Sequence, residues 1–342
     1  MNNLYLFAIV SIIFSVILTP FIKKLAIKLD IMDVPKDNRR IHNRPIPLLG
    51  GLAIYFSFII TLFLKMGKLT ESETGLILGA TIIVIGGILD DKFDIKPWCK
   101  LLFQLAAAGV LIIYGIKIEI ITNPFNSIYQ FINIGVMSIP LTIIWVIGIT
   151  NALNLIDGLD GLAAGIAFIS CITIFIIALL NNRYEAAVLT SILSGAILGF
   201  LPYNFNPASI FMGDTGAQLL GFLLAAISME GAIKSAAAFS VAVPILALGI
   251  PIYDTLFAVI RRKINGKPIM EADRGHLHHR LLDMGLTQKQ VVMIMYSISA
   301  VLGSISIIAM EINEQKSYFL LMIVMVILVF MAWKAGFFKH KE

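Results

Sequence analysis

The sequence is filled from end to end with uninterrupted apolar runs, each near the roughly 20 residues that a helix needs to cross a lipid bilayer. Inside hydrocarbon only a helix or a closed barrel satisfies its own backbone hydrogen bonds. A barrel strand alternates apolar and polar side chains, whereas these runs are apolar throughout. We therefore predict an all-α polytopic membrane protein with about eleven transmembrane helices, near residues 4–22, 49–66, 74–89, 98–116, 135–152, 162–180, 186–202, 214–229, 235–258, 290–310 and 317–336.

The composition agrees, because 58% hydrophobic and 14% charged residues exclude an ordinary soluble domain. The first run is followed by "KKLAIKLD" rather than by a small-residue cleavage site, so we expect a retained helix and no secretory signal. Cys99 and Cys171 lie in or next to predicted spans. We expect them to be inert packing residues, without a disulfide framework or a cysteine zinc site.

The basic residues divide the chain into two sides. Segments 23–48, 90–100, 259–289 and 334–342 carry 20 of the 26 Lys and Arg residues, and cytoplasmic loops collect such residues. We therefore predict an outside N-terminus and a cytoplasmic C-terminus. The chain is expected to form a single domain over residues 1–342, with inner loops at 23–48, 90–100, 151–161, 203–214 and 259–289.

Acidic residues gather on the same side, since all twelve Asp residues lie in predicted inner segments or at inner ends of spans. In "GGILDDKFDIKP", Asp90 and Asp91 close the third span. Adjacent carboxylates beside hydrocarbon repel each other unless a cation, a donor or a shared proton compensates. A solvated loop start is the alternative interpretation.

The stretch "NALNLIDGLDGLAAG" places four polar side chains at steps of three residues after the fifth span. They are Asn151, Asn154, Asp157 and Asp160, which would fan across half of a helix. Carboxylate and amide oxygens suit Mg²⁺ or Mn²⁺, and amides can also read a base or a sugar. The alternative is a helix end with Asx turns.

The stretch "FMGDTGAQ" places Asp214 at the start of the eighth span. A carboxylate is favourable at a helix N-terminus, so Asp214 is either a functional residue or a cap. Phe211 is either a core residue or a platform for stacking a ring.

Two inner loops combine Arg and His. The later one, "DRGHLHHR", contains Arg274, His276, His278, His279 and Arg280. Zinc is conceivable there, but flanking arginines oppose a metal and favour a phosphate or diphosphate. A solvated basic loop is the alternative.

The first inner loop offers Arg39, Arg40 and His42, which either bind phosphate or only set the topology. Cations and carboxylates on one surface are what phosphoryl transfer requires.

The order of these motifs resembles a known family. "RPIPLLGG", "LDDKFDIKPWCKLLFQ", "NALNLIDGLDGLAAG", "FMGDTGA" and "DRGHLHHRL" are similar to the motifs of the polyprenyl-phosphate N-acetylhexosamine-1-phosphate transferases, over about residues 33–290. The resemblance implies a bacterial plasma-membrane enzyme that moves a sugar 1-phosphate from a UDP-linked amino sugar to undecaprenyl phosphate, releasing UMP, with Mg²⁺ or Mn²⁺. It implies no nucleic-acid partner and is compatible with a homodimer.

The resemblance also implies residue roles. Catalysis would fall to Asp90, Asp91 and Asp157, and the metal to Asp214, Asn154 and Asp91. The nucleotide and sugar would contact Asp160, as the reader of uracil, and Phe211, as the stacking ring, together with Asn151, Arg274, His276, His278, His279 and Arg280. The lipid phosphate would contact Lys100, Arg39, Arg40 and His42.

The form "HLHH", with Leu277 interrupting the histidines, is similar to the branch that uses UDP-N-acetylglucosamine and starts teichoic acid, enterobacterial common antigen or O-antigen. The peptidoglycan enzyme that uses UDP-N-acetylmuramoyl-pentapeptide has three consecutive histidines and is the main alternative. A transporter is a remote one, because the polar residues gather at one interface and no internal repeat is visible.

Overall fold

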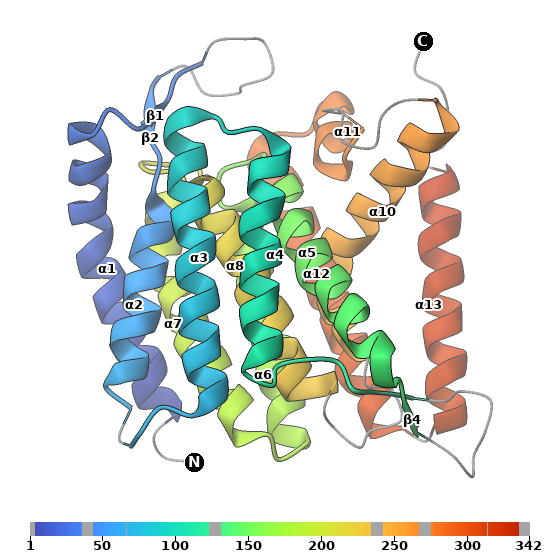
Figure 1. Ribbon diagram of the computed structural model, residues 1–342. Coiled ribbons are helices and arrows are strands. Elements are labelled where there is room, and N and C mark those ends of the chain that lie inside the picture. The colour runs from blue at the N-terminus through green and yellow to red at the C-terminus, as the bar shows by residue number, and fades with distance from the viewer. Residues whose placement is uncertain are drawn as a thin grey trace.

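The computed structural model describes residues 4–35, 44–65, 67–122, 131–233, 242–266, 275–312 and 314–334. Over these ranges the chain is a bundle of helices with two small antiparallel hairpins (Figure 1). Six of the described helices are long and apolar enough to cross a membrane. The prediction of an all-α polytopic membrane protein is therefore confirmed, and the count of eleven spans stays a prediction.

The elements follow the predicted apolar runs closely. The six long helices are α1 (Leu4–Lys28), α3 (Glu71–Phe93), α5 (Ser138–Ile156) with the preceding 3₁₀ turn η1 (Gly135–Met137), α6 (Leu162–Leu180), α7 (Tyr184–Asn204) and α12 (Gln288–Glu311). The others are α2 (Gly50–Phe63), α4 (Pro97–Ile113), α8 (Gly213–Ser228) with the π-helical turn η2 (Met229–Ile233), α9 (Ala242–Ala247), α10 (Gly249–Ile264), α11 (Leu277–Asp283) and α13 (Glu314–Lys334). The hairpins pair β1 (Met32–Asp33) with β2 (Ile46–Pro47), and β3 (Ile120–Thr122) with β4 (Phe131–Asn133).

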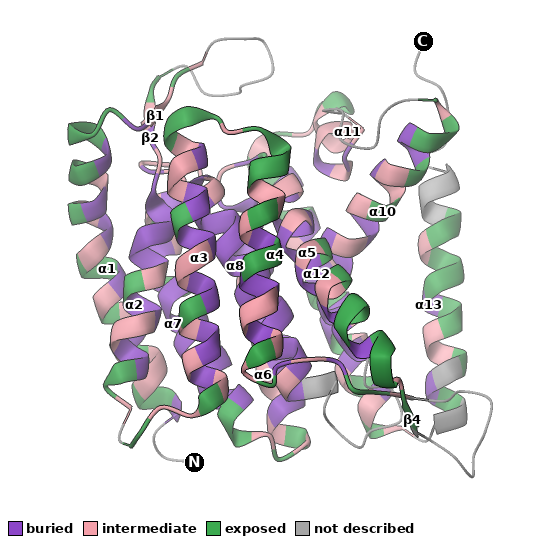
Figure 2. Cartoon of the chain, in the orientation of Figure 1, coloured by how far each residue is buried: buried purple, intermediate pink, exposed green. Residues whose placement is uncertain are grey.

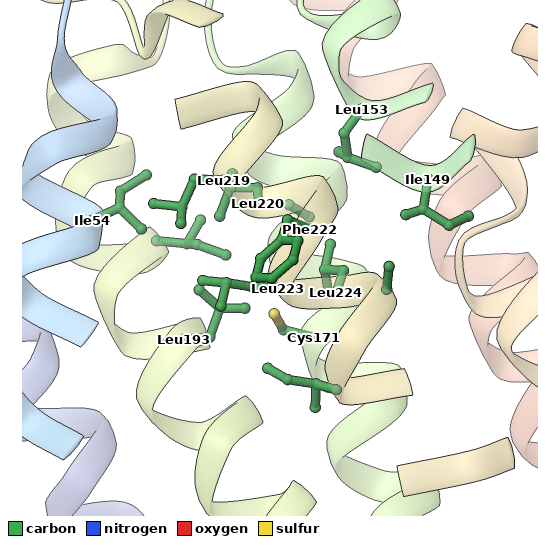
Figure 3. Packing of buried hydrophobic residues seen from close by; sticks show 14 of the residues in the cluster. Ile54, Ile149, Leu153, Cys171, Leu193, Leu219, Leu220, Phe222, Leu223 and Leu224 are labelled. Carbon is green, nitrogen blue, oxygen red and sulfur yellow. The ribbon is translucent and has the colours of Figure 1, made fainter. Parts of the chain in front are cut away.

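Helix α8 is the centre of the bundle. All of its residues except Asp214 are buried (Figure 2), and it packs against α2, α3, α5 and α6. Its leucines and Phe222 interdigitate with apolar side chains from the surrounding helices, including the buried Cys171 (Figure 3). Cys99 differs from the prediction of a packing residue, because it is exposed on α4.

Two glycines let neighbouring helices approach the start of α8. A Cβ on Gly51 would lie 2.2 Å from the Cα of Gly216, and a Cβ on Gly87 would lie 2.4 Å from the Cα of Thr215. Side chains there would push α2 and α3 away from α8. The "GG" of the first motif therefore has a packing role.

The predicted single span at 235–258 is wrong in one respect, because α9 ends at Ala247 and a separate helix, α10, starts at Gly249. Pro251 has no N–H to donate to the carbonyl of Ala247, four residues earlier. That carbonyl accepts instead from Ser170 Oγ of α6 at 2.8 Å. Hydropathy could not reveal the break, since both halves are apolar.

The polar motifs lie at one end of the bundle. The last turns of α3 and α5, the first turn of α8, and α11 are all found at the upper end in Figure 1. This arrangement is consistent with the prediction that the motifs cluster on one side of the membrane.

Candidate active site

A lysine between two carboxylates forms the middle of the site. Lys100 Nζ, in the first turn of α4, forms ion pairs with Asp90 at the end of α3 and, at 2.7 Å, with Asp214 at the start of α8. Their shared partner Lys100 holds the Asp90 and Asp214 carboxylates close to each other. Two carboxylates this close require a shared proton or a cation between them.

Asp91 faces the start of α8 rather than Lys100. Its Oδ1 accepts from the backbone N–H of Asp214 at 2.7 Å, and its Oδ2 accepts from Thr215 N at 3.1 Å and Thr215 Oγ1 at 2.6 Å. Gly213 makes room for it, with φ 70° and Asp91 Oδ2 2.5 Å from where a Cβ would be. Asp91 thus caps α8 from another helix, because first-turn N–H groups have no partner within their own helix.

The end of α5 and the loop after it add polar side chains. Asn154, in the last turn of α5, lies next to Asp214. Asp157 ends that helix as its C-cap residue. Removal from water, together with the charges of Asp214, Asp91 and Asp160, raises the pKa of Asp157 to about 8.

Asp160 lies beside the loop between α7 and α8. Its Oδ2 accepts from Asn206 Nδ2 at 3.0 Å and from the backbone N–H of Ala208 at 2.9 Å. Asn206 Nδ2 also donates to Gln288 Oε1, in the first turn of α12, at 2.8 Å. Asp160 therefore links three segments that are far apart in the sequence.

Asn151 points to a different polar network. Its Nδ2 donates to Gln104 Oε1 at 2.8 Å and to the carbonyl of Ile147 at 2.8 Å. Gln104 Nε2 donates to Gln218 Oε1 at 3.1 Å, and Gln218 Nε2 lies 3.4 Å from Asp214 Oδ2. An amide chain through α5, α4 and α8 thus leads from Asn151 to Asp214.

The first motif supports the segment that carries Phe211. The N–H of Phe211 donates to Pro47 O at 2.8 Å, and Gly50 N donates to Phe211 O at 2.9 Å. These two backbone hydrogen bonds fix the position of the residues that precede α8 and Asp214. Phe211 is half-buried next to the cluster.

The histidine segment approaches the aspartate loop. His278 is buried, its ring lies 4.2 Å from that of His279, and its Nε2 lies 2.6 Å from where a Cβ on Gly158 would be. Burial, together with the charge of the neighbouring His279, lowers the pKa of His278 to about 3. His278 is therefore neutral at physiological pH.

His276 and Arg280 are held by neighbours that the sequence analysis did not identify. His276 Nδ1 lies 2.7 Å from Asp254 Oδ2, and Arg280 Nε donates to Gly275 O at 3.0 Å. The sequence analysis assigned no role to Asp254, Gln104 or Gln218. Asp254 is a lone ionisable side chain in an apolar run, which usually marks function or a specific partner. The two glutamines follow Lys100 and Asp214 by four residues, one helical turn, at the ends of the quoted motifs.

Among the predicted site residues, Arg39, Arg40, His42 and Arg274 lie outside the described residues. The structure brings Asp90, Asp91, Lys100, Asn154 and Asp214 together. Asp157, Asp160, Phe211 and the three histidines lie in the segments next to this cluster, and Asn151 is joined to it through amides. Their roles stay predictions.

The donor set fits a hard divalent cation. The described residues contain no group of three or more His, Cys, Asp or Glu side chains arranged around a metal. Mg²⁺, however, takes one or two protein carboxylates and completes its shell with water and substrate phosphates. Asp214 and Asn154 supply such oxygens, whereas the oxygens of Asp91 already accept three hydrogen bonds.

Comparisons with known proteins agree with the order of the motifs. The family description "Glycosyl transferase family 4" matches residues 74–232. A Bacillus subtilis protein named "Probable undecaprenyl-phosphate N-acetylglucosaminyl 1-phosphate transferase" is 40% identical over 334 residues, covering 97% of this chain and 92% of the relative.

More distant relatives carry similar names. The decaprenyl-phosphate N-acetylglucosaminephosphotransferase of Mycobacterium tuberculosis is 34% identical, over 86% of this chain and 80% of its own length. The undecaprenyl-phosphate alpha-N-acetylglucosaminyl 1-phosphate transferase of Escherichia coli K12 is 27% identical, over 94% of this chain and 86% of its own length. The chain therefore belongs to glycosyl transferase family 4, in the branch of the undecaprenyl-phosphate N-acetylglucosaminyl 1-phosphate transferases.

Proposed function

We propose that this protein transfers N-acetylglucosamine 1-phosphate from UDP-N-acetylglucosamine to undecaprenyl phosphate, starting a lipid-linked glycan of the bacterial envelope such as teichoic acid or O-antigen. The observation that carries the proposal is Lys100 held between Asp90 and Asp214 at the polar end of the bundle. A cation at that end can attract the phosphates of both a lipid and a nucleotide. The names of the relatives support the choice of both substrates.

The reaction exchanges one phosphate linkage for another. An oxygen of the lipid phosphate attacks the phosphorus that carries the sugar, the bond from that phosphorus to the bridging oxygen of the UMP moiety breaks, and UMP leaves. No protein-bound intermediate is needed. Lys100 is placed to attract the phosphates, and Asp90 orients Lys100 and the attacking phosphate.

Asp214 and Asn154 would hold Mg²⁺ or Mn²⁺, which would neutralise charge on the diphosphate. Asp91 fixes the turn that carries Asp214, through the backbone N–H groups of Asp214 and Thr215. The metal-ligand role predicted for Asp91 competes with these bonds, so we propose a positioning role for it.

The donor side lies in the loops around the cluster. Asp160 and Phe211 are proposed to bind the uracil, and the histidine segment to face the diphosphate and sugar. Asp160 Oδ2 already accepts two hydrogen bonds, which leaves Oδ1 as the oxygen proposed to accept a hydrogen bond from the base.

The proposed setting is the bacterial plasma membrane, with the site on the cytoplasmic face, where UDP-sugars occur. The basic inner loops and the bacterial sources of the relatives support it. A homodimer is a further prediction, to be checked by light scattering of the purified protein.

The test is UMP release by the purified protein with undecaprenyl phosphate and Mg²⁺. UDP-N-acetylglucosamine, UDP-N-acetylgalactosamine and UDP-N-acetylmuramoyl-pentapeptide are offered in parallel, with Asp214→Asn as the inactive control. Release with the first donor alone supports the proposal. Release with the pentapeptide alone favours the peptidoglycan enzyme, and no release with any donor contradicts the proposed reaction. Loss of release with EDTA and recovery with Mg²⁺ tests the metal.

A further inference from the structure

A buried carboxylate on α10 lies next to the histidine segment. Asp254 is inside a predicted apolar run, and only 4% of it is exposed. Its Oδ2 lies 2.7 Å from His276 Nδ1, and its Oδ1 accepts from the backbone N–H of Leu277 at 2.8 Å. Both oxygens therefore contact the residues that start α11, and a buried carboxylate is costly unless it has such a partner.

A second anchor lies on the same face of α10. Arg261 follows Asp254 by seven residues, nearly two helical turns, and its Nη1 donates to the carbonyl of Gly275 at 2.9 Å. Arg261 is 6% exposed. A Cβ on Gly275 would lie 2.1 Å from Arg261 Cζ, so the guanidinium fits only because residue 275 has no side chain.

The anchored segment continues toward the aspartate loop. The ring of His276 stacks parallel on that of His278, with centroids 5.8 Å apart and planes 9° apart. His278 in turn lies against Gly158, next to Asp157. A displacement of His276 would therefore be transmitted through His278 to the loop that carries Asp157 and Asp160.

The carboxylate also determines how His276 can act. Because Asp254 accepts the proton on Nδ1, Nε2 is the ring nitrogen left to bind another group. This effect does not require Asp254 to touch a substrate.

We propose that Asp254 and Arg261 are positioning residues, which hold the segment 275–279 so that His276 acts on the nucleotide-sugar donor. The proposal rests on the proposed function for the identity of that donor. Asp254 acts through His276, and Arg261 acts through the backbone of Gly275.

The test is a double-mutant cycle of Asp254→Asn and His276→Gln. We expect Asp254→Asn to raise KM for UDP-N-acetylglucosamine on the order of tenfold, with a smaller change in KM for undecaprenyl phosphate. In the His276→Gln background the same change should alter KM less than about twofold, since the partner is already gone. Asp30→Asn, an exposed carboxylate at the end of α1, is the matched control and should match the wild type.

A second measurement does not depend on turnover. Hydrogen–deuterium exchange of the ligand-free protein should be faster over residues 275–283 in Asp254→Asn and in Gly275→Ala, and unchanged over α6. If Asp254→Asn fails to fold, Arg261→Lys is used to test the proposal instead. We expect this variant to show faster exchange in the same segment and a raised KM for the donor. Equal effects of Asp254→Asn with and without His276, or unchanged exchange, would overturn the proposal. A wild type that uses another UDP-sugar would overturn only the donor, and the cycle is then run with that sugar.

Discussion

At the scale of single residues, the aspartate pair separates into two kinds of contact. Asp90 is paired with Lys100, whereas Asp91 accepts three hydrogen bonds from the first turn of α8. Adjacent carboxylates of one motif therefore face different partners. Their contributions to stability and to turnover should differ accordingly.

We expect Asp91→Asn to lose turnover and also to unfold more easily than the wild type. One carboxylate oxygen becomes an NH₂ group, which faces the N–H donors of α8, and a hydrogen bond to a charged group contributes about 1.5–3 kcal/mol. Asp214→Asn should lose turnover with little change in melting, because Asp214 accepts none of the backbone bonds of that turn and Lys100 keeps Asp90 as its ion-pair partner. Melting in detergent and UMP release are measured for both variants. An inactive Asp91→Asn that melts like the wild type would indicate a direct chemical role instead.

The buried His278 gives a pH dependence of stability. Burial lowers its pKa from 6.5 to about 3, so the folded state binds its proton less tightly than the unfolded state. The contribution is fully present above pH 6.5 and is lost as the pH falls from 6.5 toward 3. We expect the melting temperature of the wild type to fall more steeply between pH 6.5 and 4.5 than that of His278→Gln. Parallel curves for the two proteins would contradict a neutral buried imidazole.

At the scale of elements, hydroxyl groups satisfy the carbonyls that prolines leave without a donor in apolar helices. The carbonyl of Ala247, to which Pro251 cannot donate, accepts from Ser170. Likewise Pro20 in α1 cannot donate to the carbonyl of Val16, which accepts from Tyr203 of α7 at 3.2 Å. Each of these carbonyls thus has a donor from a neighbouring helix.

We expect Ser170→Ala to destabilise the protein by about 1–3 kcal/mol, because it leaves the Ala247 carbonyl unsatisfied in an apolar setting. Ser304→Ala is the matched control, since Ser304 is exposed and bonds only to its own helix, at Ala300 O. Thermal unfolding in the same detergent compares the two. Equal melting of both variants would show that the Ala247 carbonyl finds another donor.

The same elements show which parts of the fold could be predicted from the sequence. Helix α6 spans the predicted residues 162–180, because a continuous apolar run in lipid can satisfy its backbone hydrogen bonds only as a helix or in a closed barrel. The clustered motifs were found for a similar reason, since several polar groups together stand out from apolar surroundings. Asp254, Gln104 and Gln218 were missed because the partner of each is supplied by a segment far away in the sequence. The break before Pro251 was missed because hydropathy does not register a lost hydrogen bond.

At the scale of the whole molecule, the polar end and the opposite end of the bundle should face different compartments. In a Cys99→Ser background, a cysteine at the exposed Glu185 at the start of α7 reports on one end, and a cysteine at the exposed Met284 after α11 reports on the other. We expect a membrane-impermeant maleimide to label Glu185→Cys in intact cells and Met284→Cys only after lysis. The reverse pattern would contradict a cytoplasmic site.

The Asp90–Lys100 ion pair also bears on how the chain is made. Helices α3 and α4 leave the ribosome long before α8, whose Asp214 lies 123 residues after Asp91. During that interval Asp90 has its counter-ion within the same helical hairpin. The hairpin can therefore enter the bilayer with one charge neutralised, before Asp214 on α8 joins Asp90 and Lys100.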